Sequence, residues 1–268
     1  GKRTNTILQS AFFSLANVMP GEDIIYFGDT GRVPYGNRSN ETIKKYAYQD
    51  ASFLKSKNVK AIIAACGTVS SVATELESDL DVFYTGVLKP TATKAVSYTK
   101  NGKIAVLGTS ATIRSGSYER EIKTINPDIE VIVQDCPLFV PLVENGFTNK
   151  DNEITKLTVE HYLKNIKSLG ADTVILGCTH YPIIKAIIGE YLGMKVKLID
   201  SGSATAYHCA DYLREHDMLN SSEVPGKTEY YVSDTEESFR KLAGIFLKEK
   251  LGENVFHIDI SQFKKITN

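Results

Sequence analysis

The sequence predicts an α/β fold, and two features of its hydrophobic pattern lead to that prediction. Short runs rich in β-branched residues alternate along the chain with longer amphipathic stretches, as expected for strands that alternate with helices. The short runs are apolar nearly throughout, which means that both faces of each strand are covered and is typical of parallel sheets flanked by helices. A chain of 268 residues is long enough for two modest domains.

Seven short runs are predicted to form strands. In chain order they are DIIYFGD (23–29), VKAIIAAC (59–66), DVFYTGV (81–87), GKIAVLGT (102–109), IEVIVQDC (129–136), ADTVILGC (171–178) and MKVKLIDS (194–201). Apolar residues at helical spacing predict helices at 41–57 and 151–170, and Gly170 is suited to end the second of them. Residues 1–21 also have the pattern of an amphipathic helix.

Composition and charge exclude several classes of function. The formal net charge is −1, with Lys and Arg scattered along the chain, so we expect no nucleic-acid partner. No apolar run approaches the roughly 20 residues that span a bilayer, and the N-terminus lacks a signal-peptide pattern, so we expect no membrane association. Cys66, Cys136, Cys178 and Cys209 show no close spacing such as CxxC. This argues against a metal site and a disulfide framework, and predicts a reduced, cytoplasmic protein.

Reactive side chains cluster at the carboxyl ends of the predicted strands, where α/β folds bind ligands. They are Asp29, Thr30, Cys66, Thr68, Thr109, Ser110, Thr112, Cys178, Thr179, His180, Asp200 and Ser201. Hydroxyl groups and the free N–H groups of helix starts bind carboxylates well. The pattern therefore predicts a site for a small anionic or zwitterionic molecule.

One arrangement occurs twice in the sequence. VKAIIAACGT (59–68) and DTVILGCTH (172–180) both pass from an apolar strand through a small residue into a cysteine and then toward a helix. The cysteines, Cys66 and Cys178, stand about 110 positions apart, which is roughly the length of one small domain. The sequence thus predicts a repeated strand-cysteine-helix unit, once in each domain.

A cysteine at a helix start has a chemical use. The partial positive charge and free N–H groups there favour thiolate over thiol, so we expect such a cysteine to act as a base or nucleophile. Pro182, which is well tolerated in a first helical turn, supports this placement for Cys178. Two opposed thiols suit a reaction that removes a proton from one face of a carbon and returns one to the other. That reaction is a racemisation or an epimerisation.

Simpler interpretations exist for each residue alone. A cysteine that ends an apolar strand is more often part of the core than of a catalytic site, so only the matched pair favours chemistry. Cys136 runs into an apolar turn and Cys209 lies in a helical pattern, and both are predicted to pack internally. His180 follows Cys178 by two residues, where it would stabilise a thiolate or carry a proton. The other histidines are interpreted as structural or surface residues: His161, His208, His216 and His257.

Six segments, taken together, resemble the motifs of the glutamate racemases, which are cofactor-independent members of the Asp/Glu racemase family. They are GDTGRVPYG (28–36), AACGTVSSV (64–72), GTSATIRS (108–115), CPLFVPLVENG (136–146), LGCTHYP (176–182) and IDSGSATA (199–206). They occur in order through nearly the whole chain, and YYVSDTEESFRKLAGIFL (230–247) extends the match.

The resemblance implies an architecture and a biological role. It implies two pseudo-symmetric, doubly wound α/β domains, residues 1–92 with 206–268 and residues 93–205, with the active site in the cleft between them. It implies interconversion of L- and D-glutamate, which supplies D-glutamate for peptidoglycan and so for the cell wall and cell shape. It also implies a homodimer, with glutamate as the small-molecule partner.

The resemblance also assigns roles to individual residues. Cys66 and Cys178 would be the two bases, one for each enantiomer, with His180 and Glu144 assisting Cys178. The positions implied to bind substrate are Pro34, Tyr35, Gly36, Gly67, Thr68, Thr112 and Thr179. Without the resemblance, Glu144 would be interpreted as a solvated loop carboxylate and Thr112 as a helix N-cap.

The sequence departs from the family pattern in two places. Gly67 stands where the family usually has asparagine, which removes an amide from the substrate site and affects selectivity or affinity. The family also begins with a strand and an Asp-Ser-Gly loop that have no counterpart in this sequence. Because loss of an inner strand would leave backbone groups unpaired, we expect that this segment precedes Gly1 in the complete protein.

Other functions stay open from the sequence alone. Gly67 is compatible with a racemase for aspartate or for several amino acids. The absent Asp-Ser loop is compatible with a non-catalytic amino-acid-binding protein, although both cysteines and His180 argue against it. A thiol oxidoreductase or a cysteine hydrolase gives no reason for the repeated unit. No lysine pattern for pyridoxal phosphate and no glycine-rich phosphate loop occurs, so we expect no cofactor.

Overall fold

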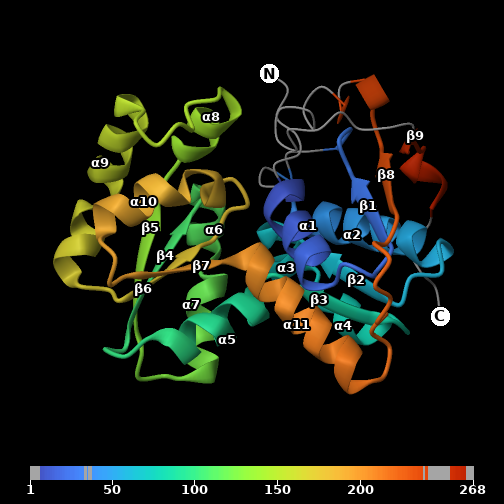
Figure 1. Ribbon diagram of the computed structural model, residues 1–268, viewed down its shortest axis with the longest axis horizontal. Coiled ribbons are helices and arrows are strands. Elements are labelled where there is room, and N and C mark those ends of the chain that lie inside the picture. Colours follow the sequence, from blue (N-terminus) through green and yellow to red (C-terminus); the bar gives the residue numbers. More distant parts are fainter. Residues whose placement is uncertain (1–6, 33–34, 36–37, 238, 241–253, 264–268) are drawn as a thin grey trace. The chain divides into compact units, whose positions relative to one another are not determined.

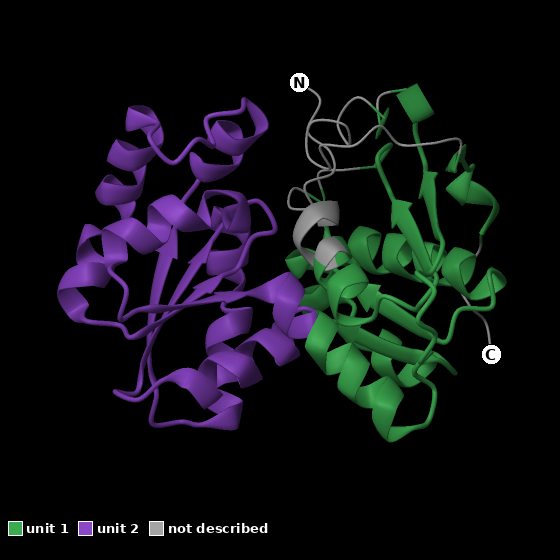
Figure 2. Cartoon of the chain, in the orientation of Figure 1, with its two compact units in different colours: residues 1–86, 206–268 green, residues 87–205 purple. Residues whose placement is uncertain are grey.

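The computed structural model describes residues 7–32, 35, 38–237, 239–240 and 254–263. Its chain forms two compact units, coloured separately in Figure 2. Unit 1 contains residues 1–86 and 206–268, and unit 2 contains residues 87–205. Helix α11 (Ser201–Glu215) begins in unit 2 and ends in unit 1.

Unit 2 is built on one parallel sheet with the strand order β5-β4-β6-β7. Its strands are β4 (Lys103–Gly108), β5 (Glu130–Asp135), β6 (Thr173–Leu176) and β7 (Lys197–Asp200). The register pairs Leu107 of β4 with Leu176 of β6, so these two inner strands end at nearly the same level. All four residues of β6 are buried, as its continuous apolar sequence predicts.

Helices cover both faces of this sheet (Figure 1). The helices of unit 2 are α5 (Leu88–Tyr98), α6 (Ser110–Ser115), α7 (Ser117–Ile125), α8 (Phe139–Glu144), α9 (Glu153–Leu169) and α10 (Lys185–Leu192). Apolar residues of α5 and α7 pack in one cluster with Ile104, Val106 and Ile175 of the sheet. The helices α9 and α10 lie on the opposite face (Figure 1). Alternation of strand and helix around a parallel sheet confirms the predicted α/β class.

Unit 1 contains two separate parallel ladders among its described residues. One has the order β1-β8-β9, formed by β1 (Ile24–Gly28), β8 (Thr228–Val232) and β9 (Val255–His257). The other pairs β2 (Ala61–Ala64) with β3 (Phe83–Gly86). Tyr26 of β1 lies opposite Tyr230 of β8, so segments 204 residues apart in the sequence form one ladder.

The helices of unit 1 pack their buried residues against these strands. They are α1 (Ile7–Val18), α2 (Asn40–Ser56), α3 (Gly67–Val72), α4 (Leu76–Asp79) and most of α11. Ser39 is the N-cap of α2, and its hydroxyl accepts a hydrogen bond from the backbone N–H of Thr42. Its buried face includes Ile43, Ala47 and Ala51, which recur at helical spacing.

The seven predicted strands are all present, and each is shorter at its ends than the apolar run that predicted it. Helix α9 ends at Gly170, which has a left-handed φ of 75° and confirms the predicted C-cap. Strands β8 and β9 were not predicted. The first six residues of the predicted N-terminal helix lie outside the described residues.

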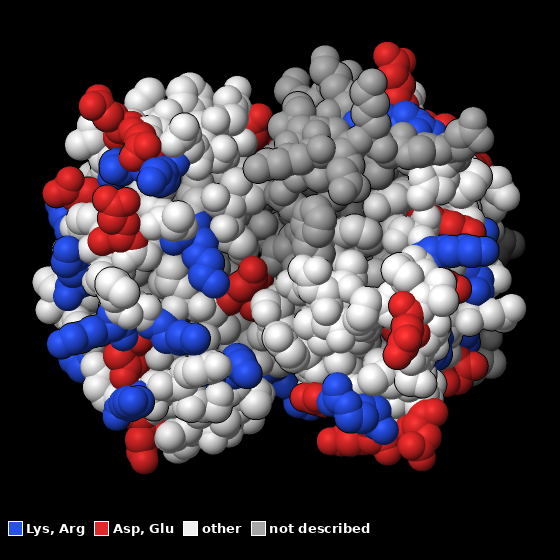
Figure 3. All heavy atoms as spheres, viewed as in Figure 1, with Lys and Arg blue, Asp and Glu red and all other residues white. Residues whose placement is uncertain are grey.

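The described part of the chain has no helix that is both long and apolar enough to cross a bilayer. On the face shown in Figure 3, acidic and basic side chains are interspersed. Arg214 and Asp211 of α11 form an exposed ion pair at 2.7 Å.

Candidate active site

Cys178 lies just beyond the carboxyl end of an inner strand of unit 2. Strand β6 ends at Leu176, and the N–H of Gly177 still donates to the carbonyl of Leu107 at 2.8 Å. A Cβ at position 177 would lie 2.7 Å from that carbonyl oxygen, so only glycine fits this close approach. The sequence therefore places Cys178 at the edge of the sheet core because Gly177 holds the chain against β4.

The turn after Cys178 differs from the predicted helix start. A one-turn 3-10 helix, η2 (Tyr181–Ile184), follows with His180 as its N-cap and Pro182 in its first two positions. Cys178 thus precedes the N-cap by two residues and is not itself the cap. A helix dipole acts mainly within the first turn, so the thiol at 178 depends more on neighbouring side chains than was predicted.

Those side chains form a chain of three polar groups. The Cys178 Sγ lies 3.6 Å from Nδ1 of His180, and Nε2 of His180 lies 3.3 Å from Oε1 of Glu144. The side chains of His180 and Glu144 are 12% and 20% exposed. An imidazole between a thiol and a carboxylate stabilises a thiolate when it carries a proton, and the carboxylate stabilises that imidazolium.

Buried aromatic packing holds this arrangement in place. Tyr181 is fully buried, and its hydroxyl donates to the carbonyl of Cys136 at 3.1 Å. Its ring also meets Phe139 edge-on, with centroids 5.2 Å apart. Because Phe139 begins α8 and Glu144 ends it, Tyr181 connects the turn that carries His180 to the helix that carries Glu144. Cys136 is itself fully buried, which confirms its predicted packing role.

Cys66 occupies the corresponding position in unit 1. Strand β2 ends at Ala64, and Cys66 is the N-cap of α3, as the repeated pattern predicts. Cys66 makes no side-chain capping hydrogen bond, but the nearby N–H groups of Val69 and Thr68 and the Thr68 hydroxyl lower the pKa of its thiol. Burial raises that pKa by more, and the charge of Asp50 adds to the rise. The net direction is upward, because burial outweighs the helix-start N–H groups that favour the thiolate.

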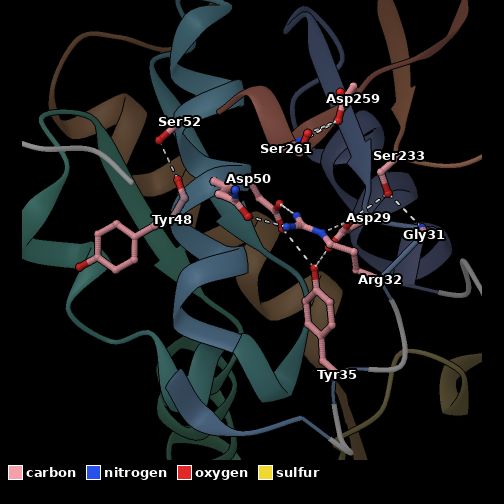
Figure 4. Close-up of polar contacts among 11 residues, drawn as sticks. Asp29, Gly31, Arg32, Tyr35, Tyr48, Asp50, Ser52, Ser233, Asp259 and Ser261 are labelled. Atoms are coloured by element: carbon pink, nitrogen blue, oxygen red, sulfur yellow. Dashed lines mark hydrogen bonds and ion pairs between the residues drawn. The ribbon is translucent and has the colours of Figure 1, made fainter. Parts of the chain in front are cut away.

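Tyr35 lies in a dense group of polar side chains in unit 1 (Figure 4). Its hydroxyl donates to Asp29 and lies 3.2 Å from Oδ2 of Asp50, and the residue is 8% exposed. The pKa of the Tyr35 phenol is raised far above its ordinary value, chiefly by burial and then by both carboxylates. The Tyr35 hydroxyl therefore forms its hydrogen bonds with carboxylates of unit 1. Pro34 and Gly36, predicted beside it, lie outside the described residues.

The remaining predicted site residues follow strands in both units. Gly67 is the first residue of α3, and Thr179 lies between Cys178 and His180. Thr109, not Thr112, is the N-cap of α6: its hydroxyl accepts from the N–H of Thr112 at 3.3 Å. The two threonine hydroxyls lie 3.0 Å apart at the carboxyl end of β4.

Comparison with known proteins places the chain in a family. A profile of the family described as Asp/Glu/Hydantoin racemase matches residues 8–209. The chain belongs to the Asp/Glu/Hydantoin racemase family. A protein named glutamate racemase from Geobacter metallireducens is 43% identical over 252 residues, which cover 94% of this chain and 92% of that protein. This family member is therefore a racemase, an enzyme of the isomerase class.

Solved structures of other family members have the same fold. The crystal structure of a glutamate racemase isoform from Bacillus anthracis gives a TM-score of 0.86 at 30% identity, covering 95% of this chain and 94% of that one. The glutamate racemase of Francisella tularensis, crystallised in complex with D-glutamate, gives a TM-score of 0.82 at 34% identity with the same coverage. The resemblance found in the sequence motifs is thus confirmed for family and fold.

Sequence reasoning about this racemase missed three polar residues near Tyr35. Arg32, Asp50 and Ser233 complete the group around Asp29, which the sequence had marked only as a strand end. One signal for Asp50 was available, because it falls seven positions after Ile43 on the otherwise apolar stripe of α2. Within the described residues, no set of three or more His, Cys, Asp or Glu side chains is placed to hold a metal ion.

Proposed function

We propose that this protein is a glutamate racemase that interconverts L- and D-glutamate without a cofactor, with Cys66 and Cys178 as its two bases. Relatives at 43% and 45% identity over more than nine tenths of the chain bear that name, which supports the substrate. One structural observation carries the mechanism. Of the four cysteines, only Cys66 and Cys178 are partly exposed, and both follow parallel strands at their carboxyl ends.

The proposed reaction is balanced in protons and involves no change in oxidation state. The thiolate of one cysteine removes the α-proton of glutamate and becomes a thiol, leaving the electron pair on the substrate. The thiol of the other cysteine returns a proton to the opposite face of the same carbon and becomes a thiolate. Each turnover therefore exchanges the protonation states of Cys66 and Cys178, and the reverse reaction restores them.

The two thiols have different support, which suits opposite roles in one cycle. Backbone N–H groups and the Thr68 hydroxyl face Cys66, whereas the imidazole of His180 faces Cys178. A raised pKa makes the Cys66 thiolate a stronger base once it has formed. On the other side, His180 and Glu144 would stabilise the Cys178 thiolate before it attacks.

Negative charge that develops on the substrate carboxylate needs donors placed in advance. Hydroxyls of Thr68, Thr112 and Thr179 are proposed to supply them, together with the backbone around Gly67. The segment that includes Pro34, Tyr35 and Gly36 is proposed to complete the substrate contacts. Because Gly67 brings no amide side chain, aspartate is the second candidate substrate, and it is compared with glutamate in the same assay.

The family resemblance also supports a biological setting for the reaction. We propose that the protein acts in the cytoplasm as a homodimer and supplies D-glutamate for peptidoglycan synthesis. Sedimentation of the purified protein at several concentrations measures the oligomeric state. A mass of one chain at every concentration would contradict the homodimer.

The deciding experiment follows exchange of the α-proton in D2O by NMR, with L- and D-glutamate supplied separately. We expect the wild type to exchange and racemise both enantiomers. Cys66→Ser and Cys178→Ser should each abolish racemisation, because each removes one of the two bases, while one-sided exchange by the other thiol continues. Cys209→Ala, at a buried cysteine on α11, serves as the matched control and should racemise normally.

Two results would count against the proposal. A folded wild-type protein that binds glutamate yet exchanges neither enantiomer is a receptor. Racemisation of aspartate but not glutamate would assign the second candidate substrate instead.

A further inference from the structure

We propose that Arg32 is a positioning residue for racemisation, because it holds Asp29, Asp50 and Tyr35 in a single arrangement on the Cys66 side of the reaction. This inference rests on the proposed function, in which Cys66 is a base and the segment around Tyr35 binds substrate. It concerns side chains that do not themselves contact the reacting atoms.

The guanidinium of Arg32 is held from three directions (Figure 4). Its Nε donates to both carboxylate oxygens of Asp29 at 2.8 Å. Nη1 donates to Oε1 of Gln49 and Nη2 to Oδ1 of Asp50, each at 2.6 Å. The ring of Tyr46 covers its face, with 4.1 Å from the guanidinium carbon to the ring centroid. A planar fork of donors is needed to satisfy all of these contacts, so lysine cannot replace it.

The same carboxylates hold Tyr35. The phenol donates to Asp29 and lies within hydrogen-bond distance of Asp50, so Arg32 and Tyr35 share both acids. The ring of Tyr46 lies 5.9 Å from the ring of Tyr35 and also covers the guanidinium, so it packs against both residues. Arg32 therefore supports the position of Tyr35 indirectly. Both residues contact the two carboxylates, and both pack against the ring of Tyr46.

The start of the segment 29–35 is linked to strand β8 by the same group of polar side chains. Ser233, just after β8, donates its hydroxyl to Oδ1 of Asp29 at 2.8 Å. The same hydroxyl oxygen accepts the N–H of Gly31 at 3.0 Å. A Cβ at Gly31 would lie 3.1 Å from the carbonyl oxygen of Ser233, so the two chains approach closely here. Residues 29, 31 and 35 are thus connected through one network to α2 and β8.

Charge explains why Arg32 dominates this network. The side chains of Asp29 and Asp50 are 7% and 20% exposed, and a single guanidinium, itself 16% exposed, faces both. Burial and the charge of Asp29 hold the pKa of Asp50 well above its ordinary value, while Arg32 and Tyr35 oppose that rise. Removing Arg32 would leave two buried carboxylates facing each other, whereas removing Asp50 leaves the balanced pair of Arg32 and Asp29.

The network reaches Cys66 by packing and by charge. Tyr35 belongs to the apolar cluster against which Cys66 packs, and α2, which carries Asp50, packs on α3, which Cys66 caps. The charge of Asp50 raises the pKa of the Cys66 thiol. Tyr84 of β3 also faces the thiol, and its own pKa is raised by burial and by Cys66. Tyr26 of β1 faces Asp29 and stays protonated because burial raises its pKa.

The first test measures kinetics for Arg32→Lys, Arg32→Gln and the double variant Arg32→Gln/Asp50→Asn. The matched control is Arg214→Gln, which removes an exposed ion pair in the same unit. We expect Arg32→Lys to lose about tenfold and Arg32→Gln about a hundredfold in kcat/KM, mainly as a higher KM. The double variant should recover part of the Arg32→Gln loss, because it removes one of the two facing carboxylates. Enantiomers have equal free energies, so kcat/KM must stay equal in the two directions for every variant.

The second test reads the thiols directly and does not need activity. Iodoacetamide labelling of Cys66 and Cys178 is measured by mass spectrometry against pH in the wild type and in Asp50→Asn. Loss of the Asp50 charge should lower the pKa of Cys66, so its labelling should begin at lower pH. The labelling profile of Cys178, in unit 2, should not move. Circular dichroism establishes that each variant is folded.

These outcomes separate the inference from the proposed function. If folded Arg32→Lys keeps the KM and kcat of the wild type, Arg32 is not a positioning residue. If Asp50→Asn shifts the labelling of neither thiol, or of both, the network does not act on Cys66 as described. If the wild type itself fails to racemise glutamate, the proposed function fails, whereas the labelling of Cys66 still tests the link from Asp50 to the thiol.

Discussion

Cys66 and Cys178 come from the same sequence pattern but meet different partners. Cys66 is the N-cap of a six-residue helix and lies near the N–H groups of Thr68 and Val69, which lower the pKa of its thiol. Cys178 stands ahead of a 3-10 turn and lies beside His180, which in turn lies beside Glu144. A two-base enzyme with unequal bases should respond differently to loss of support on each side.

The His180 and Glu144 pair yields a prediction for single residues. His180→Gln should lower kcat by about a hundredfold or more, because it removes the imidazole that lies beside the Cys178 thiol. Glu144→Gln keeps the imidazole but loses the charge that stabilises it, so a smaller loss of about tenfold is expected. Steady-state kinetics with each enantiomer of glutamate measures both.

The exposed His161 on α9 supplies the control for this pair, and His161→Gln should keep wild-type kinetics. A loss in Glu144→Gln as large as that in His180→Gln would contradict the order, because Glu144 would then be acting on the substrate directly rather than through the imidazole.

At the scale of elements, the β4 and β6 pair determines where Cys178 emerges. Gly177→Ala would bring a Cβ to 2.7 Å from the carbonyl oxygen of Leu107 and 3.1 Å from the ring of Tyr118. Because a backbone carbonyl in a buried sheet cannot move aside easily, we expect a loss of about 1–3 kcal/mol in the free energy of unfolding. Urea denaturation measures it, and racemase activity should fall as Cys178 is displaced.

Gly189→Ala in α10 is the matched substitution. There the nearest atom to the added Cβ is a Leu198 methyl carbon at 3.5 Å, an ordinary contact, and alanine favours the helix. We expect it to raise the free energy of unfolding by up to about 1 kcal/mol. Equal stability changes in Gly177→Ala and Gly189→Ala would show that the close approach of β4 and β6 is not what requires glycine.

Whole-molecule packing sorts the four cysteines into two classes. Cys66 and Cys178 are partly exposed, whereas Cys136 and Cys209 are buried. Burial also raises the pKa of Cys209 to about 12 and that of Cys136 further still, so neither forms a thiolate at neutral pH.

We therefore expect iodoacetamide to label two cysteines of the native protein, Cys66 and Cys178, and all four only after unfolding. Peptide mass spectrometry of samples taken over time identifies the labelled positions. Native labelling of Cys136 at the rate of Cys178 would contradict the buried packing of that residue beneath Tyr181.

Local pattern was sufficient for much of the fold. Continuous apolar runs located the seven strands, and β6, which is buried throughout, has the coverage on both faces that such a run predicts. Gly170 marked the end of α9 because a left-handed residue at that position favours glycine. Strand β9 has three residues, too few for a hydrophobic period, and its pairing with β8 becomes visible only in the folded chain.

The sequence by itself determined the α/β class, the family and the placement of Cys66 and Cys178 at strand ends, because these follow from hydrophobic period and ordered motifs. Only the tertiary structure decided the partners of those residues. Glu144 meets His180 across 36 positions, and Ser233 meets Asp29 across 204. Such contacts depend on how strands pair and helices pack, and a linear pattern does not record which distant segments become neighbours.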